Sequence, residues 1–179
     1  MLLNERHTRP ERLLTVANAM MTAARTAPKG KGFDIIEVIT LTGEHIRELS
    51  DAMRVYSEQT GLKFVLRDAE NILQAEALVL IGTRQQLHML NCGYCGFESC
   101  SEKLEHPDVP CAVNTVDVGI AIGSACAVAA DARVDSRVMF SAGRVAQALN
   151  LLPGCSSIYA IPISASSKNP FFDRTSKKS

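Results

Sequence analysis

Residues 91–111 read NCGYCGFESCSEKLEHPDVPC, and the rest of the chain is organised around this stretch. It contains four of the six cysteines, spaced C-x2-C-x4-C-x10-C: Cys92, Cys95, Cys100 and Cys111. Gly93 and Gly96 each follow a cysteine, where they allow tight turns and can direct amide N–H groups at the sulfurs. A short loop with three thiolates and a fourth further along the chain is typical of a [4Fe–4S] site. The sequence therefore predicts an iron–sulfur cluster held by these four cysteines.

Two other uses of the thiols remain open. Structural zinc also takes four thiolates, but it favours two C-x2-C pairs, and this chain has one such pair. Disulfides would suit a secreted protein, whereas the N-terminus becomes charged at once and lacks the apolar segment of a signal peptide. Iron–sulfur ligation is the favoured interpretation of the three.

The length and charge of the chain narrow the classes of function. At 179 residues we expect one domain, 1–179, with the cysteine loop 91–112 inserted after a central strand. Basic and acidic residues number 19 each, so no net field attracts nucleic acid or an anionic membrane. The longest uncharged apolar run, 118–130, is too short to span a bilayer and predicts a buried helix. We therefore expect a protein that binds neither nucleic acid nor membrane. Its clustered thiols, and an N-terminus uncharacteristic of export, predict a reducing, cytoplasmic location.

The apolar pattern predicts both helices and strands. Helical spacing predicts four helices, at 10–27, 43–59, 114–132 and 136–152. Apolar and β-branched runs predict three strands, at 34–41, 77–81 and 157–163. Pro162 predicts an edge strand or a bulge, because proline cannot donate to a sheet ladder. Phe171 and Phe172 are expected to dock on the body of the protein or on a partner.

No side chain stands out as a general acid or base, so the catalytic residues are unknown. The four histidines are scattered, and the two that flank the cysteine loop, His88 and His106, are predicted to be surface residues. The PKGKG segment at 28–32 is either a solvated turn, which is favoured, or a loop that grips a phosphate.

The cysteine loop resembles a known module. CGYCGFESC with a later cysteine is similar to the four-cysteine iron–sulfur module of membrane-complex ferredoxin subunits and corrinoid iron–sulfur proteins. On that resemblance Cys92, Cys95, Cys100 and Cys111 are the ligands. The gap before Cys111 is shorter than the module usually has.

Nearly the whole chain resembles a bacterial and archaeal family of uncharacterised proteins that contain a ferredoxin domain. The matching blocks occur in the family's order: AARTAPKGKG, LTGEHI, RDAEN, ALVLIG, NCGYCGFESC, DVGIAIGSA, AADARVDSRVMFSAG and IPISASSKNPFFDR. This resemblance implies an iron–sulfur protein and names no reaction.

A weaker resemblance is to the FMN-dependent nitroreductases. It rests on an early helix ending in Ala-x-x-Ala-Pro, a small-residue helix from Asp117, and a last strand with Pro followed by a basic tail. It implies an α+β fold with a mixed sheet flanked by helices, a homodimer, and FMN at the subunit interface. Five basic residues would then contact the flavin: Arg25, Lys29, Lys31, Lys168 and Arg174. The family's N-terminal pair of arginines is absent, since residues 4–9 read NERHTR.

Together these features predict an oxidoreductase that passes electrons between a [4Fe–4S] cluster and FMN, with a redox partner protein. Two alternatives are an electron carrier or redox sensor without flavin, and an interaction module stabilised by zinc.

Overall fold

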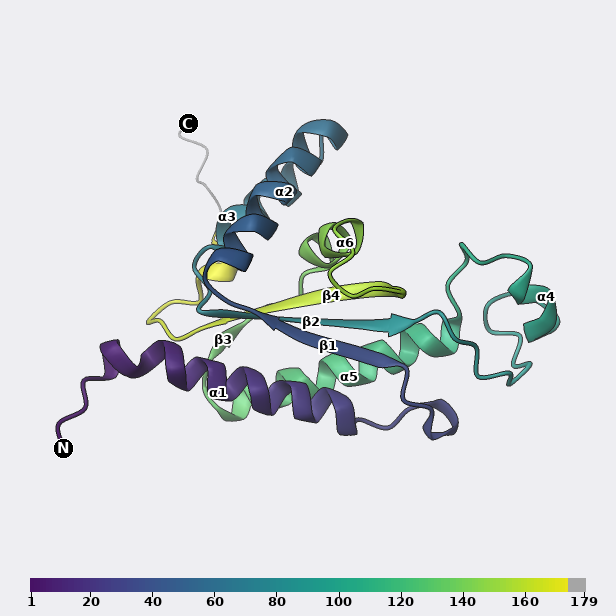
Figure 1. Ribbon diagram of the computed structural model, residues 1–179, viewed down its shortest axis with the longest axis horizontal. Coiled ribbons are helices and arrows are strands. Elements are labelled where there is room, and N and C mark those ends of the chain that lie inside the picture. The colour runs from purple at the N-terminus through teal and green to yellow at the C-terminus, as the bar shows by residue number, and fades with distance from the viewer. Residues whose placement is uncertain (174–179) are drawn as a thin grey trace.

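The computed structural model describes residues 1–173, so the predicted flavin contact Arg174 lies outside the described residues. A central sheet of four antiparallel strands has the order β1-β2-β4-β3 (Figure 1). The strands are β1 Ile36–Leu41, β2 Ala77–Arg84, β3 Asp135–Ser136 and β4 Cys155–Ser164. The predicted α+β class of helices around a sheet is confirmed, but these strands pair antiparallel rather than as the mixed sheet that was expected.

Helices cover both faces of the sheet (Figure 1). One face carries α1 Glu5–Thr26 and α5 Ala112–Asp131. The other carries α2 Glu44–Thr60, α3 Lys63–Ile72 and α6 Phe140–Ala148. The remaining elements are short: α4 Cys100–Leu104 and the 3-10 turns η1 Gly30–Gly32 and η2 Pro170–Phe172.

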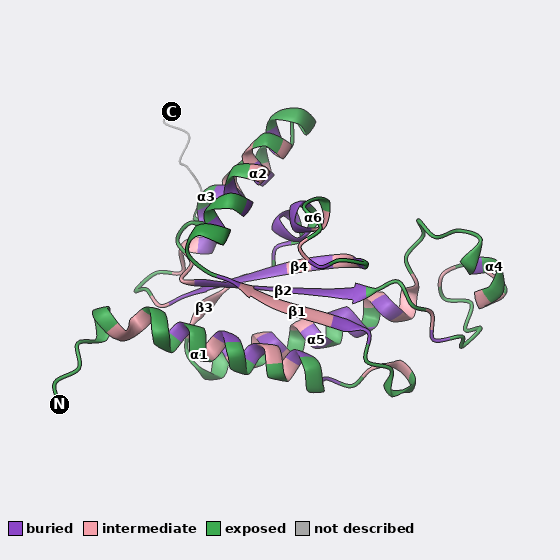
Figure 2. Cartoon of the chain, viewed as in Figure 1, coloured by how far each residue is buried: buried purple, intermediate pink, exposed green. Residues whose placement is uncertain are grey.

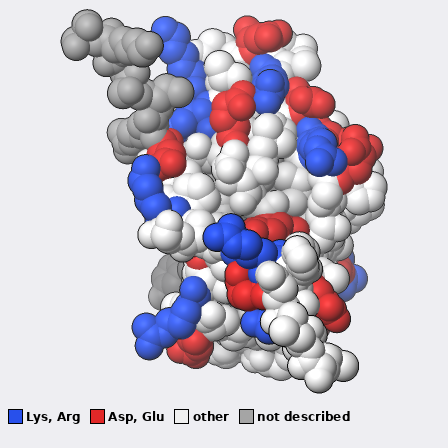
Figure 3. Space-filling view, turned by 90° about the vertical axis from the view of Figure 1, so that its left-hand side faces the viewer, with Lys and Arg blue, Asp and Glu red and all other residues white. Residues whose placement is uncertain are grey.

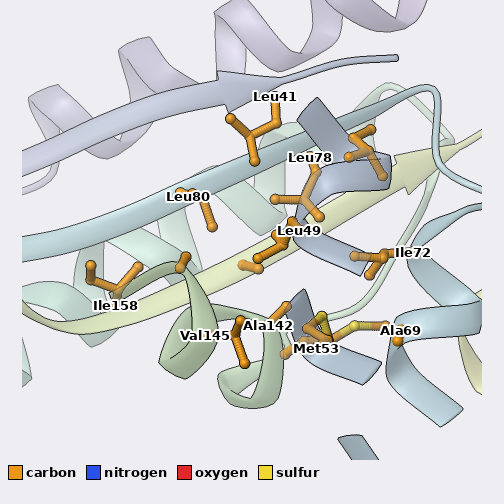
Figure 4. Close-up of a cluster of buried hydrophobic side chains, with 14 of the residues drawn as sticks. Leu41, Leu49, Met53, Ala69, Ile72, Leu78, Leu80, Ala142, Val145 and Ile158 are labelled. Atoms are coloured by element: carbon orange, nitrogen blue, oxygen red, sulfur yellow. The ribbon is translucent and has the colours of Figure 1, made fainter. Parts of the chain in front are cut away.

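Strand β2 is a continuous apolar run from Ala77 to Ile81, which is typical of a strand that is buried on both faces of its sheet. Leu78 and Leu80 point into the core beneath α2, α3 and α6, where Leu49 and Met53 of α2 meet them (Figure 4). Val79 and Ile81 point into the opposite core beneath α1 and α5. The sheet therefore separates two hydrophobic cores, and β2 contributes to both.

The main errors of the sequence prediction lie at helix boundaries. Helix α1 begins at Glu5 rather than Pro10, because the Asn4 side chain accepts from the Arg6 N–H and caps the helix. The segment 136–152, predicted as one helix, divides into the short strand β3 and α6. Helix α3 was not predicted. The N-cap positions of α2 and α5 are Gly43 and Cys111.

Pro162 lies in an interior strand rather than at the sheet edge. Ala160 exchanges backbone hydrogen bonds with Met139, on the β3 side of β4. Residues two apart on a strand direct their N–H groups the same way, so the missing donor of Pro162 faces the gap between Met139 and β3. The strand therefore tolerates proline at this position without losing a bond to β2.

The C-terminal segment docks on the helical face, as its two phenylalanines predicted. Phe171 is fully buried, and Asn71 Nδ2 and Arg137 Nη1 donate to its carbonyl oxygen at 2.9 and 2.6 Å. Phe172 is 60% exposed and lies beneath the Arg137 guanidinium. Burial of Phe171 fixes the path of the chain after β4.

Candidate functional site

The four predicted metal ligands line one cavity in the loop between β2 and α5. Cys92, Cys95, Cys100 and Cys111 all border it, although they are up to 19 positions apart. The loop projects from one end of the molecule and is mostly exposed (Figure 2). All six cysteines of the chain are free thiols. The structure thus places the four predicted ligands around one cavity.

Local backbone bonds give the loop its shape. Gly93 and Gly96 have φ of 73° and 87°, the left-handed conformation that glycine adopts without strain. The observed N–H donor to sulfur is Asn91, whose amide nitrogen lies 3.4 Å from Cys100 Sγ, rather than either glycine. The Asn91 side chain accepts from the Cys100 N–H at 2.8 Å. Asn91 therefore fixes both the backbone and the sulfur of Cys100.

Helix α5 begins immediately after Cys111, which occupies its N-cap position. The N-terminus of a long helix carries a partial positive charge that stabilises anions such as thiolates. Lys103 also borders the cavity, with a residue exposure of only 5%. The surroundings of the cysteines are therefore suited to a negatively charged group.

The thiols do not enclose a single ion. Within residues 1–173, no three His, Cys, Asp or Glu side chains are close enough together to hold one metal ion. Four thiolates around zinc would lie roughly 3.8 Å apart, given a Zn–S bond of about 2.3 Å and tetrahedral geometry. The central cavity is about 10 Å³, so a four-iron cube requires this exposed loop to open outward. Four thiolates are soft donors, a set that suits an iron–sulfur cluster and also zinc.

His88 is buried, contrary to its prediction as a surface residue. Its residue exposure is 2%, and its Nε2 lies 2.9 Å from Asp117 Oδ2 in α5. The other oxygen of Asp117 accepts from the Gly30 N–H at 3.0 Å. His106 is exposed, as predicted, and its ring stacks on Phe97. Sequence gave no signal for the His88–Asp117 pair, because the two residues are 29 positions apart.

The early basic residues lie at the same end of the molecule as the cysteine loop, and all three already have partners. Arg25 pairs with Asp34 at 2.7 Å. The Lys29 ammonium donates to the carbonyl oxygens of Ala24, Arg25 and Ala27 and so caps the end of α1. Lys31 Nζ donates to the His88 carbonyl oxygen at 3.2 Å.

Lys168 lies at the opposite end of the molecule, in the segment between β4 and η2 (Figure 1). It pairs with Asp173 at 2.7 Å, and its side chain is 77% exposed. Within a single chain, Lys168 therefore cannot share a site with Arg25, Lys29 and Lys31.

A cavity lined by three arginines lies at the same end as Lys168, and sequence analysis missed it. Its lining residues come from the start of α1, the turn after α5 and the segment after β4: Arg6, Arg9, Arg133, Ala165, Ser166 and Ser167. Arg9 pairs with Glu5 at 2.8 Å, whereas no ion pair of Arg6 or Arg133 is found among residues 1–173. Figure 3, which faces this end, shows basic and acidic side chains side by side. The signal for this cavity in the sequence was the pair Arg6 and Arg9 within the NERHTR segment.

Comparison with known proteins places the chain in a family. A protein of Archaeoglobus fulgidus, named only as uncharacterized, is 39% identical over 186 residues, covering 99% of this chain and all of the relative. The family described as "Uncharacterized protein containing a ferredoxin domain" matches residues 107–174. The chain belongs to this ferredoxin-domain family. The matched segment of the family contains Cys111 but not the other three cysteines of the cavity.

The fold of this ferredoxin-domain protein is that of nitroreductase-like flavoproteins. A nitroreductase with bound FMN from Desulfitobacterium hafniense matches with a TM-score of 0.59 and 12% identity, covering 86% of this chain and 78% of the other. A BluB-like flavoprotein from Clostridium difficile matches with a TM-score of 0.53 and 18% identity, covering 92% and 85%. The ferredoxin domain of the family and the flavoprotein fold together point to a redox function.

Helix α5 of the ferredoxin-domain protein has an unusual outer face. Apart from Asp131 at its last position, its exposed residues recur at helical spacing and carry no charge: Val116, Gly119, Ile120, Gly123, Ala127 and Ala130. At 20 residues α5 is long and apolar enough to cross a membrane, and 33% of its most apolar window is buried. Core helices of soluble proteins pass the same test, and α5 packs on α1 and the sheet. The sequence predicted a buried helix at 118–130, but only the side of α5 that faces α1 and the sheet is buried.

Proposed function

We propose that this chain is a redox protein in which Cys92, Cys95, Cys100 and Cys111 hold a [4Fe–4S] cluster and a second site binds FMN. The observation that carries the proposal is the convergence of all four cysteines on one cavity at the start of α5. When bound, the cluster supplies one-electron transfer, and FMN supplies two-electron chemistry on a small substrate. The cellular location that fits these thiols best is the reducing cytoplasm.

The protein groups around the cysteines would stabilise an anionic cluster. The Asn91 N–H donates to Cys100 Sγ, and the positive end of α5 faces Cys111. Lys103 adds a buried positive charge beside the same cavity. These contacts are the ones expected to set the cluster potential.

The arginine cavity is the best candidate for the FMN phosphate. Guanidinium groups recognise phosphate oxygens in a bidentate manner, and serine hydroxyls donate to them. Arg6, Arg9 and Arg133 face this cavity together with Ser166 and Ser167. Lys168 follows them directly and would lie beside the phosphate. Lys29 is less suitable, because its ammonium is engaged by three carbonyl oxygens.

A homodimer would bring the two sites closer together. The cysteine cavity lies at the start of α5 and the arginine cavity beyond its end, and 20 residues of helix span roughly 30 Å. Two copies that pair antiparallel along the exposed apolar face of α5 would set each cysteine cavity near the partner's arginine cavity. The uncharged glycines and alanines of that face allow close helix contact.

The first experiment is the visible spectrum of protein purified without oxygen, with iron, sulfide, zinc and flavin assayed on the same sample. We expect about four irons per chain, as one such cluster contains. Cys95→Ser should lose the iron, whereas Cys126→Ala, which removes a thiol of α5 outside the cavity, should keep it. Colourless protein with about one zinc per chain would instead support the zinc module.

Two further variants test the flavin site and the dimer. Arg9→Ala should weaken FMN binding by about tenfold through loss of a charge-assisted bond, and Lys63→Ala, on the exposed start of α3, should not. In a sedimentation experiment the wild-type protein should be a dimer. Gly123→Glu should be a monomer, and Lys63→Glu should remain a dimer. Unchanged FMN affinity in Arg9→Ala would refute the assignment of the arginine cavity to the phosphate. A monomeric wild-type protein would refute the dimer.

An electron carrier without flavin is the second candidate. Exposed apolar side chains surround the cysteine loop and would suit a redox partner protein: Met89, Leu90, Tyr94, Leu104 and Val109. Tyr94 is 80% exposed within the C-x2-C turn itself. Iron without flavin in the first experiment would favour this function.

A further inference from the structure

A second cleft lies beside the cysteine cavity, between the cysteine loop and the end of the sheet. It has a volume of about 80 Å³, several times the space that one water needs. Gln85, which follows β2, and Ser156 of β4 form one wall, and the turn with Pro107 and Pro110 forms the other. Asn114, in the first turn of α5, also lines it.

Asn114 lines this cleft and has an unpaired acceptor. The residue is 3% exposed, and its Nδ2 donates to the carbonyl oxygens of Gln86 at 3.1 Å and Arg84 at 3.4 Å. These two bonds fix the orientation of the amide, because only the NH₂ group can donate to carbonyls. Its Oδ1 is buried and has no hydrogen-bond partner. A buried orphan acceptor is costly, so a ligand with a donor would stabilise it.

Lys103 supplies a buried positive charge to the same cleft. The residue is 5% exposed, and its Nζ donates to the His106 carbonyl oxygen at 2.9 Å. An ammonium can donate three hydrogen bonds. Among residues 1–173 no carboxylate forms an ion pair with Lys103. A buried ammonium without a counter-ion favours binding of an anion.

We propose that this cleft binds a small carboxylate that also carries a hydrogen-bond donor, the class of 2-hydroxy acids. The carboxylate would pair with Lys103, and the hydroxyl would donate to Asn114 Oδ1. Leu87, Lys103 and Cys111 border both cavities, so the ligand would lie next to the cysteine site. The proposal goes beyond the proposed function by naming a class of ligand, and it does not depend on which cofactor the cysteines hold.

The test is calorimetric titration of the full chain, purified without oxygen, with glycolate and with acetate. Glycolate should bind saturably and more tightly than acetate, because acetate lacks the hydroxyl donor. Lys103→Met should weaken both by about tenfold or more, the loss of a charge-assisted bond. Asn114→Ala should abolish the preference for glycolate over acetate. Lys63→Met, at an exposed lysine of α3, is the matched control and should change neither.

Several outcomes would overturn the proposal. These are absence of saturable glycolate binding, equal affinity for acetate in the wild type, and unchanged binding in Lys103→Met. The wild-type comparison of the two acids needs no variant, so it decides the point even if Asn114→Ala fails to fold. Iron is assayed on every sample. Loss of iron with retained glycolate binding in Lys103→Met would assign Lys103 to the metal site instead. Colourless wild-type protein that binds glycolate would refute the proposed function but not this cleft.

Discussion

His88 Nε2 lies 2.9 Å from Asp117 Oδ2, and both side chains are almost completely buried. The same carboxylate accepts the Gly30 N–H through its other oxygen. One aspartate of α5 therefore joins the segment that leads into the cysteine loop to the turn that follows α1. Lys31 adds a second link, because its ammonium donates to the His88 carbonyl oxygen.

Asp117→Ala should destabilise the protein by about 3 kcal/mol, since it leaves the buried His88 ring N–H and the half-buried Gly30 N–H without their acceptor. Amide hydrogen exchange at residues 30–33 should rise more than the global loss of stability explains. Asp131→Ala, at the exposed end of α5, is the control and should change neither quantity. Unchanged exchange at residues 30–33 would show that the carboxylate does not hold the turn.

Phe171 and Phe172 form a matched pair for testing how the C-terminal segment docks. Phe171→Ala should cost about 3–5 kcal/mol, as expected for a fully buried aromatic side chain. Phe172→Ala should cost below about 1 kcal/mol, because it loses an exposed contact with Arg137. Chemical denaturation of the two variants measures both values. Equal costs would mean that the segment is not anchored through Phe171.

The sequence predicted the elements with strong local signals. The apolar run at 77–81 was consistent with a buried strand and is one, and the glycine after α2 adopts the left-handed conformation that ends a helix. The spacing of the four cysteines suggested that they share one site, and in the structure all four line one cavity. Helix boundaries were less predictable, since the Asn4 cap and the division of 136–152 depend on competing local and tertiary contacts.

The groups that tertiary structure assembles could not be predicted. Arg6, Arg9 and Arg133 meet only because the start of α1 lies beside the turn after α5. His88 appeared to be a surface residue because its partner Asp117 is distant in sequence. A single sequence reveals structure mainly through periodic patterns of apolar residues, and neither arrangement produces such a pattern.

Glu76 gives the stability a defined dependence on pH. Its Oε2 is buried without a partner, and burial raises the pKa of the Glu76 carboxyl above its ordinary value. The unfolded chain has the ordinary pKa and the native protein the raised one. Between these two pKa values the native state binds more protons than the unfolded state, so stability falls as pH rises through this window. Glu76→Gln should therefore be more stable at neutral pH and should lack this decline. Thermal unfolding across acidic pH tests this, with the exposed Glu58→Gln as control.

The six cysteines should divide into two classes of reactivity in metal-free protein. Burial raises the pKa of the Cys126 thiol, and burial together with the nearby Glu37 carboxylate raises the pKa of the Cys155 thiol. Only the thiolate attacks a disulfide reagent, so these two thiols should react slowly at neutral pH, and their rates should rise about tenfold per pH unit. The four cysteines of the exposed loop should react first. Cys126→Ala should remove one slow equivalent and leave the four fast ones. A fast count other than four would contradict the assignment of the loop cysteines as the accessible set.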